Sequence, residues 1–434
     1  MSMSHRFRIT AAVALALSGV SAIGWSQAAP ASGDTTRLAI TTYGEVRTRS
    51  EWDRPLAAAS SDFFTLMRSR LGVRIVPSSS AKIVMEMQDS RVLGDATSTA
   101  RQSFNLHQGY LELSTPLAGR TLNIRAGRQE IALANERLVG VVGWSNFGRA
   151  FDGLRVSMTS KNATSWTADV FGATLEERGR HFGPDRAAPT QDHSLGGVFL
   201  TRSLNRAGTA RAELTGLLDV GSGYRAFHDA RRSTVDLRLR HANLAGLRVE
   251  LEGALQNGRQ HVVIDSVHNP QEVGAWLAGV RVGNVTTSNS PLGVVIGVDM
   301  LSGDANARDD KYSAFSTLYG TNHPYYGLID LIGDPAATTR ERGLQDLFVQ
   351  TDVRFTDRLR VHGEVHHMRL ATGNNRDLGW EADAVLPLAL SELARIDIGY
   401  SAFRAGAGAA DVGLGTKGNI QHWAYVQLRA SFQR

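Results

Sequence analysis

Segments in which apolar and polar side chains alternate recur from residue 37 to the C-terminus. In residues 246–257, for example, Val249 and Leu251 alternate with Glu250 and Glu252. Successive side chains of a β-strand point to opposite faces, so this period of two predicts strands with one apolar face and one charged face.

The alternation predicts about 18 strands, each roughly ten residues long. They are 37–49, 62–76, 81–92, 104–114, 120–129, 150–159, 163–173, 193–203, 209–220, 233–243, 246–257, 273–283, 292–302, 346–356, 359–370, 377–386, 393–403 and 419–432. The connections alternate between short and long, and only 371–376 is short where a long one is expected.

An even number of strands, with short turns at one end and long loops at the other, is typical of outer-membrane barrels. A soluble β-sandwich would also alternate, but its strands are shorter and its polar face meets water. We therefore predict an all-β fold, a transmembrane outer-membrane β-barrel of about 18 antiparallel strands within residues 29–434.

The first 28 residues have the pattern of a Sec signal peptide. Arg6 and Arg8 precede an apolar run over 9–23, and the small residues Ser26 and Ala28 occupy the positions expected before a cleavage site. The run is too short to cross a membrane comfortably as a helix, and a core helix is the alternative interpretation. The chain contains no cysteine. An exported protein without disulfides needs another form of closure, which a barrel supplies.

The basic residues are almost all arginines, because the chain has only four lysines. The net charge is +5, and acids are interleaved with the arginines. This distribution, together with export, argues against a nucleic-acid partner. The planar guanidinium group instead binds carboxylates through two parallel hydrogen bonds.

Strand parity turns many arginines toward the lumen, where rings of arginine select anions. The candidate pore-lining residues are Arg47, Arg49, Arg68, Arg70, Arg74, Arg125, Arg128, Arg149, Arg155 and Arg354. Parity turns almost as many acids inward, so cross-strand ion pairs that stiffen the wall are the competing interpretation for any single arginine.

Arg128 does not fit strict parity, which turns it toward lipid, where a charge is costly. The sequence allows two solutions: the strand ends before Arg128, or a bulge turns it inward. Both place it at the rim of the pore.

The long connection 130–149 carries several apolar side chains, including Leu138, Val139, Trp144 and Phe147. A fully solvated loop would not need them. We predict that this loop folds against the inner wall and narrows the pore, so that deletion of 134–146 raises conductance and weakens anion preference.

Several motifs resemble the alginate-export family of outer-membrane barrels. They are HQGYLEL (107–113), GRQE (127–130), ERLVG (136–140), WSNFGR (144–149), FDG-x-R (151–155) and FSTLYGTNHPYYGLIDLIGD (315–334). The resemblance implies an 18-stranded, monomeric barrel that conducts an anionic uronate polymer through an arginine-lined constriction.

These observations together predict an outer-membrane channel of a Gram-negative cell that passively conducts an alginate-like anionic polysaccharide. The alternative is a porin for small organic acids or other anionic solutes. The expected partners are these polysaccharides or carboxylates, outer-membrane lipid and periplasmic export components.

No catalytic constellation or cofactor motif is recognisable, so an outer-membrane lipase or protease is the least favoured hypothesis. His362 and His366 share the lumen face, but four strand residues separate them by about 13 Å. That distance is too large for one ion without other ligands, and we expect polar lining there and no metal.

Overall fold

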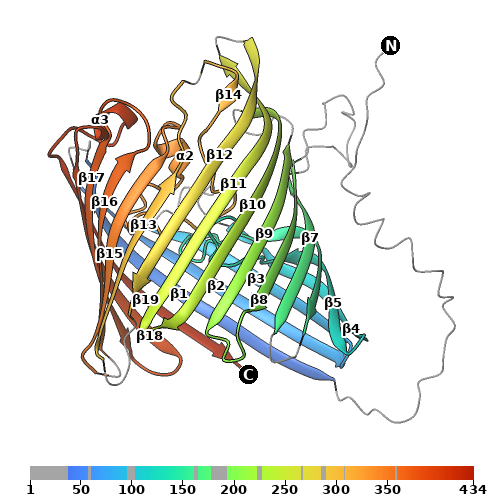
Figure 1. Ribbon diagram of the computed structural model, residues 1–434. Helices are drawn as coiled ribbons and strands as arrows, with labels where there is room; N and C mark the ends of the chain where they lie inside the picture. Colours follow the sequence, from blue (N-terminus) through green and yellow to red (C-terminus); the bar gives the residue numbers. More distant parts are fainter. Residues whose placement is uncertain are drawn as a thin grey trace, which may run out of the picture.

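The computed structural model describes residues 38–56, 60–94, 103–160, 165–176, 193–221, 227–264, 267–284, 290–306, 308–356 and 359–434. The segment predicted as a signal peptide, 1–28, lies outside them. The described strands form one sheet that closes into a barrel, in which β1 pairs with β19 (Figure 1). Of its 19 strands, the two-residue β14 (Lys311–Tyr312) belongs to a loop and pairs in parallel with β12. The remaining 18 form the antiparallel wall, which confirms the predicted fold.

Every predicted strand is present. The wall consists of β1 (Ala39–Arg54), β2 (Asp62–Ser78), β3 (Ala81–Leu93), β4 (Ser103–Leu117), β5 (Arg120–Gln129), β6 (Phe151–Thr159), β7 (Trp166–Glu176), β8 (His193–Ser203), β9 (Ala210–Gly221), β10 (Phe227–Leu244), β11 (Leu247–Ile264), β12 (Val267–Gly283), β13 (Leu292–Leu301), β15 (Leu344–Arg354), β16 (Arg360–Leu370), β17 (Asp377–Ala389), β18 (Ala394–Ala405) and β19 (Ile420–Gln433). Two short helices, α2 (Pro335–Thr338) and α3 (Ala409–Val412), lie in the connections.

The strands β10, β11 and β12 are longer than the sequence predicted. They contain 18, 18 and 17 residues, whereas about 9–11 tilted residues cross a membrane. Much of the long connections expected at 221–232 and 258–272 is therefore strand. The wall rises above its neighbours on this side (Figure 1).

The wall exposes its apolar face and buries its polar face. In β10, Val235 and Leu237 are 55% and 46% exposed, whereas Thr234 and Asp236 are 1% and 2% exposed. A soluble sheet has the opposite arrangement. The outer face therefore matches lipid, as in transmembrane barrels. No helix among the described residues has the length and apolar character needed to cross a membrane.

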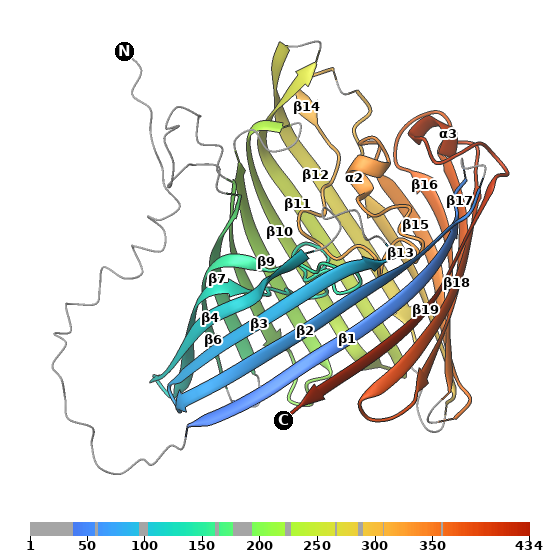
Figure 2. The same cartoon turned by 180° about the vertical axis from the view of Figure 1, so that it is seen from behind.

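Two long connections, 130–150 and 313–343, lie inside the ring of strands in both views (Figures 1 and 2). They pack on an apolar core within the lumen, to which the loops contribute Ile131, Leu138 and Phe315 and the inner wall contributes Leu195 and Leu344. Strand parity alone had predicted a charged inner face throughout. The apolar inner positions occur where the loops cover the wall and exclude water from it.

Candidate functional site

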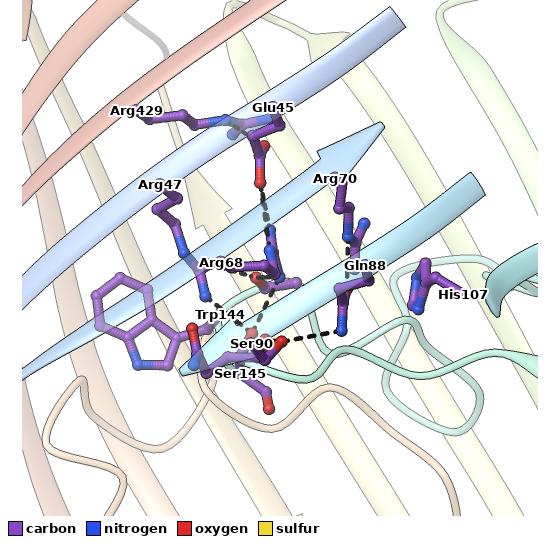
Figure 3. Close-up of polar contacts among 12 residues, drawn as sticks. Glu45, Arg47, Arg68, Arg70, Gln88, Ser90, His107, Trp144, Ser145 and Arg429 are labelled. Carbon is purple, nitrogen blue, oxygen red and sulfur yellow. Dashed lines mark hydrogen bonds and ion pairs between the residues drawn. The ribbon is translucent and has the colours of Figure 1, made fainter. Parts of the chain in front are cut away.

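The 130–150 loop is bound to the inner face of β1, β2 and β3 through its own backbone carbonyls (Figure 3). Gln88 donates from Nε2 to the carbonyl of Phe147 at 2.7 Å, and the hydroxyl of Ser90 donates to the carbonyl of Asn146 at 2.7 Å. This confirms the prediction that the loop folds against the inner wall.

Arg47 and Arg68 bind the same two loop carbonyls. The Nη1 and Nη2 atoms of Arg47 donate to Gly143 and Ser145 at 2.8 and 2.9 Å. Arg68 donates from Nη1 to these carbonyls at 3.2 and 3.0 Å and pairs with Glu45 at 2.7 Å. Both arginines are 4% exposed. The structure thus places these two predicted pore residues beneath the loop, where they anchor it.

Arg49 continues this anchor through an aromatic side chain. Its Nη1 donates to the carbonyl of Trp144 at 2.8 Å, and its guanidinium carbon lies 3.7 Å from the centre of the Trp144 ring. Arg49 also pairs with Glu51 at 2.7 Å. The Trp144 ring stacks on His323 of the second loop at 4.4 Å, with an interplanar angle of 5°. Trp144 therefore contacts both the wall and the other inner loop.

Arg70 and His107 hold the beginning of the loop at Glu130. The Nη1 atom of Arg70 lies 3.2 Å and the Nε2 atom of His107 lies 2.8 Å from the Glu130 carboxylate. Burial would raise the pKa of Glu130, but the hydrogen bond with His107 and the charge of Arg70 outweigh it, so the pKa is below its usual value. The loop thus starts at an ionised carboxylate.

The two inner loops are joined by a short parallel β-bridge between Val139 and Tyr319. The amide of Gly140 donates to the carbonyl of Tyr319 at 2.9 Å, and the amide of Tyr319 donates to Leu138 at 3.0 Å. The loops are distant in sequence, yet their backbones pair as neighbouring strands do. They form one body inside the barrel.

Arg137 fastens this body to the wall opposite β1–β3. Its side chain is 1% exposed and pairs with Asp299 at 2.8 Å and Glu252 at 3.2 Å. Burial would lower the pKa of Arg137, but these two carboxylates raise it well above its usual value. Its Nη1 also donates to the hydroxyl of Tyr326 at 2.9 Å. The sequence around Arg137 does not indicate this role, because the acids that meet it lie on the distant strands β11 and β13.

A cavity of about 650 Å³ separates the joined loops from the wall at β8–β10. Arg149 and Arg232 are the arginines of its lining. Arg149 donates to the carbonyls of Gly140, Tyr319 and Gly320, so it also links the two loops. The cavity is lined by Val142, Trp144, Ser145, Arg149, His193, Asp219, Gly221, Ala230, Arg232, Ser316, Thr317, Leu318, Tyr319, Gly320, Asn322, His323, Asp330, Gly333 and Asp334.

Arg232 is a cation of the cavity wall without a carboxylate partner among the described residues. It is 8% exposed, its Nη2 donates to Gln260 at 3.1 Å, and its buried Nε has no hydrogen-bond acceptor. A buried guanidinium group of this kind favours an anion beside it. Arg232 was not among the residues predicted to line the pore, since its segment, 221–232, was expected to be a loop.

The acids of the cavity are already engaged. Asp219 binds His193 at 2.6 Å, and Asp330 binds His323 at 2.9 Å. Asp334 caps helix α2 by accepting a hydrogen bond from the amide of Ala337 at 3.2 Å. The cavity therefore combines arginines with carboxylates that have partners of their own.

The other predicted arginines stay on the wall, away from this cavity. Arg125 pairs with Glu112 at 2.5 Å, and Arg155 pairs with Asp169 at 3.0 Å. The guanidinium carbon of Arg74 lies 5.7 Å from the Tyr43 ring centre, and Arg354 ends β15 in a half-buried position.

The structure contradicts an inward position for Arg128. Strand β5 continues through Gln129 without a register shift, and Arg128 lies opposite Gly109 and Asp152, on the face opposite to Arg125. It pairs with Asp152 at 2.5 Å, and the two side chains are 39% and 57% exposed. Strand parity therefore predicted the outward direction of Arg128 correctly. No bulge turns the side chain inward; its ion pair with Asp152 reduces the cost of the outward charge.

The sequence profile of the alginate export family matches residues 39–413. The chain belongs to the alginate export family. The family and the barrel fold are those of outer-membrane channels, and they place this member in the outer membrane of a Gram-negative cell. A search among curated proteins found no match for it.

Solved structures with the same fold include three porins of Pseudomonas aeruginosa. OccK8 (OprE) is 12% identical in sequence, with a TM-score of 0.60. The match covers 91% of this chain and 98% of OccK8. OpdK with vanillate is 11% identical, with a TM-score of 0.59 over 91% and 99% of the two chains. OccK2 (OpdF) in complex with glucuronate is 13% identical, with a TM-score of 0.56 over 91% and 97%.

Proposed function

We propose that the protein is a passive diffusion channel for small organic acids, up to the size of a single uronate sugar. The observation that carries this proposal is Arg232, a buried cation that forms no ion pair with a carboxylate among the described residues, on the wall of the 650 Å³ cavity. A carboxylate that enters the cavity meets Arg232 on the barrel wall and Arg149 on the loops. Weak binding at such sites favours anions and still permits release.

The two inner loops favour small solutes over a polymer. They are joined by a backbone bridge, anchored by arginines on one wall and held by buried ion pairs on the other. A chain of sugars would need a continuous open path past all of these contacts. The porins solved with vanillate and glucuronate share the fold and were captured with solutes of the size proposed here.

Passage of an anionic polysaccharide is the second candidate, and family membership favours it. In this case the joined loops must leave the lumen, since the arginines beneath them would otherwise not reach the polymer. The two candidates therefore differ in whether the loops stay in place during transport.

Single-channel recording in planar bilayers tests the leading proposal. The wild-type channel should prefer anions, and glucuronate should reduce the chloride current. Substitution Arg232→Gln should shift the reversal potential toward cations and weaken the block by glucuronate about tenfold, the effect of losing about 1.4 kcal/mol of binding. Arg259→Gln is the matched control, because Arg259 is 81% exposed and lies outside the cavity.

Two results would contradict the proposal. Cation preference of the wild-type channel would exclude an anion pathway. Block by long oligouronates together with no effect of glucuronate would favour the polymer instead.

A further inference from the structure

Three buried side chains that no motif joins meet on the inner face of β16 and β17. They are Glu364, His366 and Asp383, whose side chains are 7%, 0% and 6% exposed. One ligand atom from each of them lies within 4.8 Å of the others. The strand register brings them together, because Glu364 lies directly opposite Asp383 and His366 lies opposite Glu381.

Asp383 and one oxygen of the neighbouring Glu381 lack the partners that burial demands, whereas Glu364 is bound by His362 at 2.5 Å and by His366 at 2.9 Å. Neither oxygen of Asp383 accepts a hydrogen bond, and the same is true of Oε2 of Glu381 and of the Ser401 hydroxyl opposite Asp383. Like charges directly opposite each other destabilise a sheet, and a charged carboxylate is costly to bury without a partner. A positive charge between Glu364 and Asp383 would remove both penalties.

His366 is oriented as a metal ligand would be. Its Nδ1 lies 2.9 Å from Asp346, and its Nε2 lies 2.9 Å from Glu364. A proton on Nδ1 donated to Asp346 leaves the lone pair of Nε2 directed toward the carboxylates. A histidine whose outer nitrogen is held by a carboxylate is the usual support of a metal site.

We propose that Glu364, His366 and Asp383 bind a divalent transition-metal ion of the Zn²⁺ type. One imidazole nitrogen and two carboxylates suit Zn²⁺ better than Ca²⁺ or Mg²⁺, which prefer oxygen alone. Three protein ligands leave a fourth position for water. The sequence alone predicted no metal here, because His362 and His366 are too far apart to share one ion. The missing ligands are Glu364 between them and Asp383 on the neighbouring strand.

The site lies beneath the second inner loop. Glu381, the neighbour of Asp383 on the same face, accepts a hydrogen bond from the amide of Ile329 at 2.9 Å. A bound ion would therefore order the carboxylates to which this loop attaches.

Cobalt titration of the untagged, detergent-solubilised protein tests the proposal. After treatment with a chelator, the wild-type protein should bind one Co²⁺ per chain with a visible absorption band, and Zn²⁺ should displace it. Asp383→Asn should weaken this binding at least about tenfold, because loss of a residue that only hydrogen-bonds to a metal ligand already lowers affinity by about that factor. Asp152→Asn should leave it unchanged, since Asp152 is 57% exposed, lies on β6 and pairs with Arg128.

X-ray absorption of the Zn²⁺-loaded wild-type protein provides a measurement that needs no variant. It should show one imidazole and a shell of oxygen atoms. Failure of the wild-type protein to bind Co²⁺ or Zn²⁺ stoichiometrically would overturn the proposal and indicate carboxylates that share protons. Equal binding by wild type and folded Asp383→Asn would overturn it as well.

Discussion

Two walls of the barrel hold the inner loops with the same residue type but with different partners. On β1–β3, Arg47 and Arg68 bind loop carbonyls, which are neutral. On β10–β13, Arg238 and Arg281 bind carboxylates, and Arg137 of the loop joins them. Arg68 also pairs with Glu45, but Arg47 forms no ion pair among the described residues, so the first wall keeps this positive charge. The arginines of the second wall are neutralised. Arginine count alone therefore does not predict the potential of a lumen; the identity of each partner does.

Removal of the loop should have the largest effect on the difference between the two walls. When a short Gly-Ser linker replaces residues 134–146, conductance should rise several-fold, because the loop leaves the lumen. The deleted segment contains one acid and one arginine, Glu136 and Arg137, and no net charge. The deletion uncovers Arg47 and Arg68, but Arg68 keeps its ion pair with Glu45. It also removes Arg137 from Glu252 and Asp299 on the other wall. Anion preference should therefore weaken, as expected from the sequence. Planar-bilayer recording measures both quantities, and unchanged conductance would show that the loop does not limit the pore.

Arg137→Met should weaken the contact between the loop and the neutralised wall most strongly. The substitution leaves Glu252 and Asp299 facing a buried apolar side chain, and breaking a buried pair costs about 3–5 kcal/mol. We expect the substitution to weaken docking of the loop on this wall by about 3 kcal/mol, the low end of that range, since Arg281 still binds Asp299 at 2.7 Å. Hydrogen exchange of the amides in 130–150 should accelerate about 100-fold.

The control for this substitution is Arg248→Met on the same wall. Arg248 is 45% exposed and pairs with Glu250, which keeps Arg238 as a partner. Exchange within about fivefold of wild type is expected, because exposed pairs contribute up to about 1 kcal/mol. Equal exchange in both variants would contradict an anchoring role of Arg137.

The carbonyl-binding wall should show smaller, non-additive effects. Arg47→Gln should weaken loop docking by about 1.5 kcal/mol, the low end for hydrogen bonds to charged groups. Arg68 still binds both carbonyls in this variant. The double variant with Arg68→Gln should lose more than the sum of the single variants, and loop hydrogen exchange measures this coupling. Additive losses would indicate that the two arginines act separately.

The wall strands could be predicted from sequence because alternation is a local signal with two clear faces. The predicted strands 120–129 and 193–203 coincide with β5 and β8. The extensions of β10–β12 were missed, since 227–232, 258–261 and 268–272 are mostly polar and their strands continue beyond the expected span. Parity also gave the outward direction of Arg128, and the error lay in assuming that a rim charge had to turn inward.

The candidate site could be predicted only in part. The 130–150 loop was expected at the inner wall because of its apolar residues, among them Leu138 and Val139, and both are buried there. Which arginines it would cover depends on contacts across many residues, such as Arg47 with Gly143. The same limit applies to Arg232 and to the meeting of Glu364 with Asp383, because strand register and loop docking decide these positions.

The parallel bridge between Val139 and Tyr319 has a consequence for gating. Two loops that share backbone hydrogen bonds cannot swing out of the lumen independently without breaking those bonds. A force on one loop is transmitted to the other, so the obstruction moves as a single gate. Its openings should then be discrete current steps of one size, in contrast to the graded flicker of two separate flaps.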